Sequence, residues 1–363
     1  MPSAPALSLA SLRRHATRRT LFAPVDLAEA MHRLAFVQAD PIRAPARAQD
    51  LTLRHRVRAY RAGDLELHYP SLDVDEGYFV NYGFLARDAY ALLHPRAPRR
   101  AWTPTIKRRA EALLAFAVER GLVRPRDADA HFAHGRVTNY WGGLSSATTH
   151  LLDAMHYRGL LRVAQRERGV RIYAAHVHAP TANDAATRRS QLDALVDIVV
   201  RAYAPLPAQS LSQLTHRIRY RTPARAGELR AAVARAKERL AHARVDGIAW
   251  YWPADEQPTY DDDRDPAVSL LAPFDPIVWD RRRFEVFWGW AYRFEAYTPA
   301  LRRKLGYYAL PLLYRDQVIG WGNVKVHAGR IDCQLGFVDK RPRDIRFRRA
   351  LDDELARLEA FLG

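Results

Sequence analysis

Two polar side chains stand close together where an apolar helical pattern ends. Residues 36–45 read FVQADPIRAP, which places an amide, Gln38, and a carboxylate, Asp40, two residues apart and directly before Pro41. Proline pushes the residue before it out of the helical region toward an extended conformation. Because side chains two residues apart share one face of an extended segment, we expect the two groups to project together, about 6.5 to 7 Å apart at the backbone. A water molecule or a sugar carbon would fit between them.

The chemistry that suits this pair is cleavage of a glycosidic bond through an oxocarbenium-like transition state. A carboxylate stabilises positive charge on the sugar or takes a proton from the attacking water. An amide orients that water by donating one hydrogen bond and accepting another. A second carboxylic acid is unnecessary when the leaving group is already cationic, as in an N7- or N3-alkylated purine. The triplet alone is a weak signal, since polar residues commonly end helices, so the structural interpretation stays open beside the catalytic one.

Charge is the strongest signal in the composition. The chain has 57 Lys+Arg and 40 Asp+Glu, which gives a net charge of +17. Such a balance predicts a polyanionic partner, either nucleic acid or an anionic membrane surface. Arginine supplies nearly all of the positive charge, and a GC-rich genome would produce the same bias without any functional meaning.

Lysine occurs at only five positions, and none of them lies in the first hundred residues. A glycosylase that also cleaves the strand attacks the sugar with an amine, usually that of a lysine. The scarcity of lysine near the motif therefore favours an enzyme that uses water, although a lysine from another domain could reach the site.

Several other residues are candidates for DNA contact. Arg43 and Arg47 follow the motif, Arg56 lies in the next helical pattern, and Arg281 and Arg282 form a basic cluster; each is a candidate phosphate ligand or else part of a solvated surface. Tyr140 and Trp141, which precede the helical pattern at 144–160, are candidates for stacking on bases. Aromatic residues directly before a helix more often belong to a core, however.

No cofactor or metal is expected. His176 and His178 have the spacing of a metal-binding pair, but neither a cysteine nor a carboxylate cluster supports them. The single Cys333 excludes a disulfide framework and fits a reducing cytosol. We expect neither a membrane span, which needs about 20 apolar residues, nor a signal peptide.

The elements that must position these residues fall into four predicted domains, at residues 1–98, 99–180, 181–262 and 263–363. The first has amphipathic helical patterns at 7–19 and 26–38. The second has helical patterns at 103–121, 127–133 and 144–160, followed by a hairpin within 160–176, which is the order of a winged helix. The third is a further winged-helix-like block. The last is β-rich and aromatic and ends in a helix with an apolar stripe at Leu351, Leu355, Leu358 and Leu362.

Two stretches resemble the YcaQ/AlkZ family of DNA glycosylases: FVQADPIRAPARAQDL and, near the C-terminus, LLAPFDPIVWDRRR with YRFEAYTPALRRKLGYYALPLL. The resemblance implies a mainly α fold with some β structure, in which tandem winged helix-turn-helix domains precede a small C-terminal β-barrel. It also implies excision of alkylated bases, including bulky N7-guanine adducts, and in some members the unhooking of interstrand crosslinks. Family members carry a Q-x-Q or Q-x-D motif, which assigns the water-orienting role to Gln38 and the carboxylate role to Asp40.

The chain departs from the family pattern at two places. Relatives have a His-Glu-Ala-like stretch where this chain reads YFVNYGFLARDAY, and Gly-Arg-Met-Asp where it reads GWGN, with Trp321 and Asn323 in place of charged residues. The expectation is a cytoplasmic, nucleoid-associated monomer that excises alkylated bases from double-stranded DNA by a monofunctional mechanism. The alternatives are a non-catalytic tandem winged-helix protein, acting as a transcriptional regulator or lesion sensor, and an RNA-binding protein.

Overall fold

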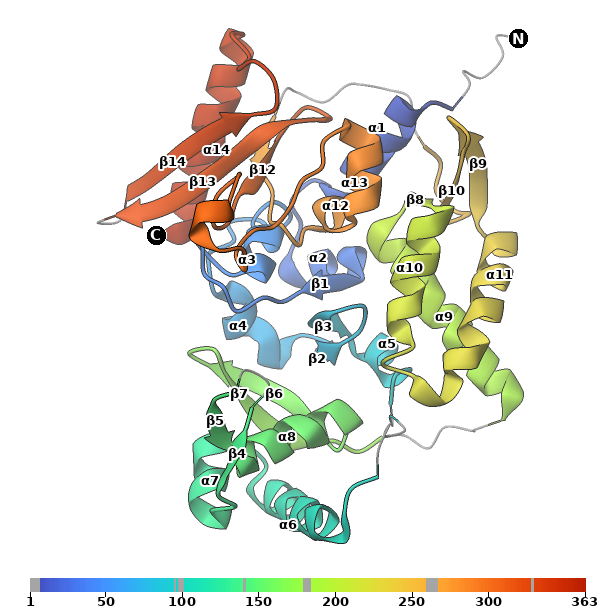
Figure 1. Ribbon diagram of the computed structural model, residues 1–363, viewed down its shortest axis with the longest axis vertical. Coiled ribbons are helices and arrows are strands. Elements are labelled where there is room, and N and C mark those ends of the chain that lie inside the picture. Colours follow the sequence, from blue (N-terminus) through green and yellow to red (C-terminus); the bar gives the residue numbers. More distant parts are fainter. Residues whose placement is uncertain are drawn as a thin grey trace. The chain divides into compact units, whose positions relative to one another are not determined.

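The computed structural model describes residues 7–94, 96, 101–139, 142–178, 184–258, 267–327 and 330–363 (Figure 1). The chain forms two compact units. The first comprises Met1–Asp64, Val196–Leu214 and Val233–Gly363, and the second comprises Leu65–Leu195 and Thr215–Ala232. The Gln38–Asp40 motif and the C-terminal β-rich block therefore belong to one unit, although more than half of the chain separates them. The division into four domains stays a prediction.

The N-terminal part of the first unit places the motif between helices. Its elements are α1 (Leu9–Thr20), α2 (Leu27–Leu34), β1 (Phe36–Gln38) and α3 (Ala48–Leu53). Polar side chains cap the first two helices: Ser8 accepts a hydrogen bond from the backbone N–H of Ser11 at 3.1 Å, and Asp26 accepts one from the backbone N–H of Glu29 at 2.8 Å. The strand β1 contacts both α2 and α3 (Figure 1).

The C-terminal part of the first unit is a four-stranded antiparallel sheet in the order β11-β12-β13-β14. Its elements are β11 (Val268–Leu270), α12 (Pro276–Trp279), α13 (Arg281–Trp288), η3 (Ala300–Arg302), β12 (Leu310–Tyr314), β13 (Gln317–His327), β14 (Arg330–Phe337) and α14 (Ile345–Leu362). The expected barrel is not confirmed, because β11 and β14 are the free edges of an open sheet in the described residues. Four strands are too few to close around a packed interior.

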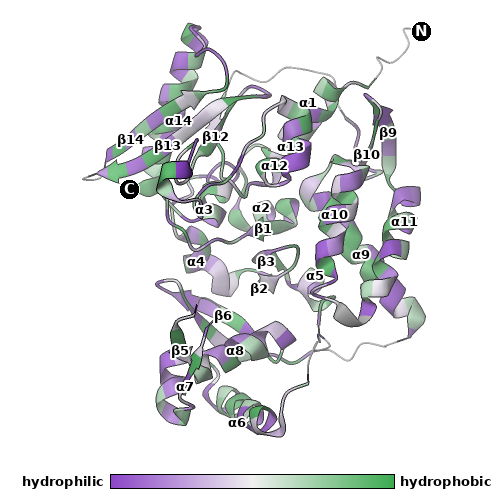
Figure 2. Ribbon diagram, viewed as in Figure 1, coloured by the Kyte–Doolittle hydropathy of each residue, from purple (hydrophilic) through white to green (hydrophobic). Residues whose placement is uncertain are grey.

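The final helix covers this sheet instead. Phe347, Leu351 and Leu358 of α14 are buried, and Phe347 meets the ring of Tyr314 on β12 edge to face at 5.2 Å. Hydrophobic and hydrophilic residues alternate along α14 at helical spacing (Figure 2). The predicted apolar stripe is thus present, but Phe347 and Phe361 contribute more to it than Leu355 or Leu362, which are only partly buried.

The remaining strands of the first unit form a small sheet in the order β8-β10-β9. They are β8 (Leu206–Pro207), β9 (Ala241–Val245) and β10 (Ile248–Trp252). The same part of the chain contains three helices whose residues are divided between the two units: α9 (Ala185–Tyr203), α10 (Ala208–Ile218) and α11 (Leu229–Arg239). The short helix η2 (Pro223–Glu228) precedes α11. The central side chain of this sheet is Trp250, which is fully buried and stacks on Phe287 of α13 at 5.0 Å.

The second unit consists mainly of the helices and hairpins of Leu65–Leu195. Its elements are α4 (Asp64–His68), η1 (Tyr69–Ser71), β2 (Val74–Tyr78), β3 (Tyr82–Ala86), α5 (Arg87–Ala91), α6 (Pro104–Arg120), α7 (Pro125–Phe132), β4 (Arg136–Thr138), β5 (Leu144–Ser146), α8 (Ala147–Arg158), β6 (Leu161–Glu167) and β7 (Val170–Ala175). Three helices followed by the hairpin β6–β7 match the predicted order. The additional hairpin β4–β5 was not predicted, and the winged-helix assignment itself stays a prediction.

No helix among the described residues combines the length and the apolar character that crossing a membrane requires.

Candidate functional site around Gln38 and Asp40

The motif begins where α2 is forced to end. Ala35, the residue after the helix, adopts φ 59°, a left-handed value that interrupts the helical hydrogen bonds. The chain then enters β1, which ends at Gln38. The prediction that the helix stops before the motif is confirmed, although it stops at Leu34 and not near Val37.

Gln38 has a buried side chain with an unsatisfied oxygen. Only 5% of the residue is exposed, and its Oε1 has no hydrogen-bond partner among the described residues. Leaving a buried amide oxygen unpaired costs free energy. Such a group is prepared to accept a hydrogen bond from a water molecule.

Asp40 is held by short local contacts. Its Oδ1 accepts a hydrogen bond from the backbone N–H of Ile42 at 2.9 Å, and its own N–H donates to Oε1 of Gln49 on α3 at 3.3 Å. The hydrogen bond from Ile42 restrains the carboxylate, and the hydrogen bond to Gln49 connects the motif to α3. Its other carboxylate oxygen, Oδ2, has no protein partner in the described part of the chain.

Burial makes the Asp40 carboxylate more basic than usual. Desolvation raises the pKa of Asp40, and the hydrogen bond from Ile42 only partly opposes this effect. A carboxylate with a raised pKa is a better proton acceptor. The group is also partly exposed, so a substrate and a water molecule can reach it.

Two tyrosines from the distant C-terminal block lie within electrostatic reach of Asp40. Burial raises the pKa of Tyr297 and of Tyr308, and the negative charge of Asp40 raises both further. Tyr308 is 4% exposed and its hydroxyl has no hydrogen-bond partner among the described residues, whereas Tyr297 is 73% exposed. A buried phenol and an exposed aromatic ring thus lie within electrostatic range of the carboxylate.

The segment that carries these tyrosines, residues 290–309, is fixed by side chains at its base. One oxygen of Glu295 accepts the backbone N–H groups of Lys304 and Leu305, each at 2.8 Å. Nδ2 of Asn323 donates to the carbonyl of Leu305 at 2.7 Å. These bonds hold the tip of the segment in the solvent, where Leu301 is fully exposed.

The two departures from the family pattern have structural roles of their own. Trp321 stacks on Trp290 at 5.8 Å, and Asn323 makes the hydrogen bond that fixes the 290–309 segment. In the second unit, Asn81 lies at the turn between β2 and β3, where it accepts the N–H of Tyr82 at 2.9 Å. The Tyr82 hydroxyl donates to the buried carboxylate of Glu76.

The residues expected to contact DNA fall into three groups. Arg43, Arg281 and Arg282 are exposed, and Arg47 is the partly buried residue that precedes the first turn of α3. Tyr140 and Trp141 lie outside the described residues.

Arg56 was expected to contact DNA, and this expectation is wrong, because its side chain has no exposed surface. Its guanidinium pairs with Asp275 at 2.8 Å and donates to the carbonyls of Thr20 and Thr52. A buried ion pair in that position joins α1, α3 and α12 and cannot bind a phosphate.

Sequence reasoning missed Gln49, Tyr297 and Tyr308. Gln49 lies only nine residues from Asp40, but a glutamine in a short helical pattern carries no signal that it will bind a neighbouring backbone. The tyrosines are more than 250 residues away, so no local pattern connects them with the motif. The only sequence feature that singled out their segment was its resemblance to the family.

Comparison with known proteins agrees with this geometry. A family model described as "DNA glycosylase AlkZ-like" matches residues 31–361. Among solved structures, the chain is similar to Streptomyces sahachiroi DNA glycosylase AlkZ, with 12% sequence identity and a TM-score of 0.61 over 98% of this chain and 97% of that one. That likeness shows a shared fold. Because the family model spans nearly the whole sequence, including the motif and the segment beside it, the chain belongs to the AlkZ-like family of DNA glycosylases.

Proposed function

We propose that this DNA glycosylase is monofunctional and hydrolyses the N-glycosidic bond of purines alkylated at N7 or N3. The observation that carries the proposal is the buried, unpartnered oxygen of Gln38 two residues from a partly exposed carboxylate whose pKa is raised. An unsatisfied acceptor next to a basic carboxylate is what an attacking water needs, because one group orients the water and the other takes its proton.

The reaction balances without an external acid. The bond between C1′ and the purine nitrogen breaks, and its electron pair neutralises the positive charge of the alkylated base. Negative charge on Asp40 stabilises the oxocarbenium-like sugar. Water held by Gln38 then adds to C1′, and its proton passes to the Asp40 carboxylate. The products are the neutral free base and an abasic sugar.

The exposed parts of the site suit a duplex with a bulky lesion. Leu301 belongs to the same segment as Tyr297 and Tyr308 and is fully exposed, and Arg302 and Lys304, which follow it, are also exposed. Proteins that insert an apolar side chain between adjacent base pairs of DNA combine such side chains with basic residues. A carboxylate that is partly open to solvent accommodates an adduct too large for a closed pocket, and the same argument extends the proposal to unhooking of crosslinks.

Arginines on the surface would hold the DNA backbone. Arg43, Arg47, Arg281 and Arg282 are the proposed phosphate ligands. The protein would act as a monomer on the nucleoid, in the cytoplasm, and would need no metal or cofactor.

The test is release of free base from a duplex that contains one N7-methylguanine, compared with a duplex that carries a bulkier N7 adduct. Asp40→Asn should slow release by about 10²- to 10⁴-fold, and Gln38→Ala by about 10²-fold through misplacement of the water. If neither duplex loses its base, or if both variants match the parent, the protein is a non-catalytic DNA-binding protein of the regulator or lesion-sensor kind.

Borohydride tests whether the enzyme is monofunctional. Lys304 lies in the 290–309 segment and is the lysine to suspect if an amine attacks the sugar. We expect no trapped covalent complex, since water is the nucleophile in the proposed mechanism. A trapped complex that disappears with Lys304→Arg would replace water with this amine.

A further inference from the structure

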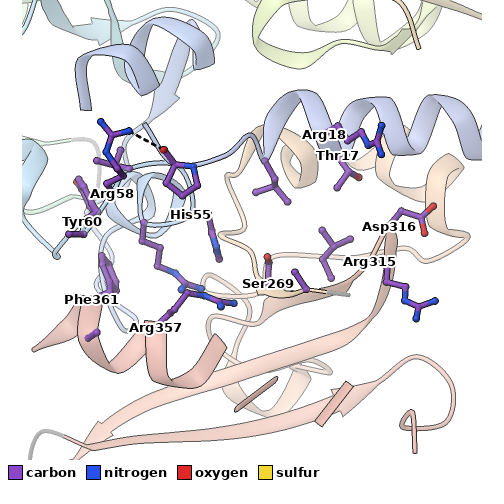
Figure 3. Close-up of a pocket in the computed structure, with 18 of the residues that line it drawn as sticks. Thr17, Arg18, His55, Arg58, Tyr60, Ser269, Arg315, Asp316, Arg357 and Phe361 are labelled. Carbon is purple, nitrogen blue, oxygen red and sulfur yellow. Dashed lines mark hydrogen bonds between the residues drawn. The ribbon is translucent and has the colours of Figure 1, made fainter. Parts of the chain in front are cut away.

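A large cavity in the first unit lies apart from the residues of the catalytic motif. Its volume is about 720 Å³, within the range of small-molecule sites. It is bounded by α1, by residues 54–61 after α3, by β11 and β12, and by the last turns of α14 (Figure 3). Neither Gln38 nor Asp40 nor any residue of the 290–309 segment lines it.

Positive charge dominates the lining. Among the described residues that line the cavity, one is a carboxylate, Asp316, and seven are arginines, namely Arg14, Arg18, Arg54, Arg58, Arg61, Arg315 and Arg357. Asp316 is already paired with Arg13, which lies outside the lining, through contacts of 2.9 and 3.0 Å. Asp316 is therefore occupied by an arginine from outside the lining.

A buried glutamate accounts for two of the arginines. Glu354 of α14 has no exposed surface and pairs with Arg54 at 2.5 Å and with Arg357 at 3.1 Å. His55 adds no positive charge at neutral pH, because burial and the adjacent Arg54 lower its pKa to about 3.

Four arginines of the lining make no ion pair in the part of the chain that the structure describes: Arg14, Arg58, Arg61 and Arg315. Nε of Arg14 is buried and has no hydrogen-bond partner there either. Arg58 donates only to the carbonyl of Pro24, at 3.2 Å. Arg58, Arg61 and Arg315 are exposed, so an anion from the solvent can reach them.

Four of the lining arginines lie at the two ends of the cavity (Figure 3). Arg58 and Arg357 lie toward one end and Arg18 and Arg315 toward the other, with Ser269 between them (Figure 3). Leu21, Val57 and Leu313 supply apolar surface to the walls. The lining thus offers separate positions for negative charge and for an apolar body.

We propose that this cavity binds a nucleotide, with its phosphates on the unpaired arginines at one end and its base against the apolar walls. The planar fork of arginine matches phosphate oxygens in pairs. Several unpaired cations suit a group with several negative charges better than the single charge of a carboxylate. The proposal does not depend on glycosylase activity, because the cavity and the motif share no residue.

The experiment is calorimetric titration of the full-length protein with ATP, AMP, adenosine and tripolyphosphate, without magnesium. We expect ATP to bind more tightly than AMP, and adenosine not to bind measurably. Tripolyphosphate should bind about tenfold or more weakly than ATP, because it lacks the body that fills the apolar wall.

A matched pair of double variants separates the cavity from the general charge of the protein. Arg61→Ser with Arg315→Asn removes two cavity arginines, and asparagine tolerates the left-handed backbone of residue 315, where φ is 57°. Arg348→Ser with Arg349→Ser removes two exposed arginines of α14 that do not line the cavity. The first pair should weaken ATP binding by about tenfold or more, and the second should change it little.

Three results would overturn the proposal. They are no binding of ATP by the parent protein, equal binding of ATP and tripolyphosphate, and equal losses from the two double variants. Circular dichroism confirms that each variant is folded before titration. Binding of duplex with and without saturating ATP then shows whether DNA occupies the same arginines, in which case ATP competes with undamaged duplex and the nucleotide assignment fails.

Discussion

Asp40 is a residue at which stability and activity pull in opposite directions. Its pKa is raised in the folded protein because burial disfavours the charged form. A group of this kind stabilises the fold below its unfolded-state pKa of about 3.9, and that stability is lost as the pH rises through the higher folded-state pKa. At neutral pH the ionised carboxylate therefore lowers the stability of the folded protein.

Asp40→Asn should raise the melting temperature at pH 7 and abolish most base release. Asparagine imitates the protonated acid and can still accept the N–H of Ile42. The difference in melting temperature between variant and parent should shrink as the pH falls to about 4. Differential scanning calorimetry at the two pH values measures it, and a variant that is less stable than the parent at pH 7 would show that burial does not control this carboxylate.

Two arginines near the motif should behave in opposite ways. Arg56→Met removes one partner of a fully buried ion pair with Asp275, which should cost about 3 to 5 kcal/mol of unfolding free energy. Arg43→Ala, at an exposed position, should cost less than about 0.5 kcal/mol yet weaken duplex binding and lower the slope of log affinity against log salt by about one.

Urea unfolding and fluorescence anisotropy with duplex DNA distinguish the two effects. If Arg56→Met keeps the parent's stability but loses DNA affinity, the buried pair does not have the structural role assigned to it.

The terminal helix α14 is joined to two distant elements by one carboxylate. Glu354 accepts hydrogen bonds from Arg54, next to α3, and from the backbone N–H of Leu270 on β11 at 2.7 Å. Although burial opposes ionisation, the neighbouring cations and hydrogen bonds prevail and lower the pKa of Glu354. A lowered pKa contributes stability above the unfolded-state value of about 4.3, and that stability is lost as the pH falls through the folded-state pKa.

Glu354→Gln should therefore destabilise the protein by about 3 to 5 kcal/mol at pH 7 and by less at pH 4. Chemical unfolding at both pH values provides the measurement. A loss that is equal at the two pH values would mean that the amide fails for steric reasons and not through loss of charge.

The 290–309 segment depends on a donor from β13. Asn323→Ala and Asn323→Asp should both loosen it, because neither side chain can donate to the carbonyl of Leu305 at neutral pH. We expect faster tryptic cleavage after Arg302, Arg303 and Lys304, together with slower base release.

The aspartate variant is the sharper of the two because it keeps the shape of asparagine. If it retains the parent's cleavage rate and activity, hydrogen-bond donation by Asn323 is not what fixes the segment.

At the scale of the whole molecule, the sequence predicted local features well and long-range ones poorly. The helical pattern predicted from residue 26 contains α2, and Pro41 marked where helix is excluded, because periodicity and proline act over a few residues. The end of α2 at Ala35 was not predictable, since alanine carries no preference for positive φ. The closed barrel failed for another reason: counts of strand-like stretches do not say whether their edges meet.

The same limit applies to the site. Gln38 and Asp40 were identifiable from their types and their spacing. Tyr308 and the buried pairing of Arg56 were not, because they depend on the tertiary fold, which brings together residues more than 200 positions apart in the sequence. Arginine gave the least reliable signal, because the same residue type occupies an exposed surface at Arg43 and a fully buried ion pair at Arg56.

The first unit is assembled from segments at both ends of the chain, with Leu65–Leu195 inserted between them. On a ribosome, residues 1–64 emerge roughly 15 to 60 s before the last residues of Val233–Gly363, at about 5 to 20 residues per second. During that interval Arg56 and Arg54 lack their partners Asp275 and Glu354, because these residues are synthesised later. The ion pairs that join the two ends of the chain are therefore both in place only after α14 has been synthesised.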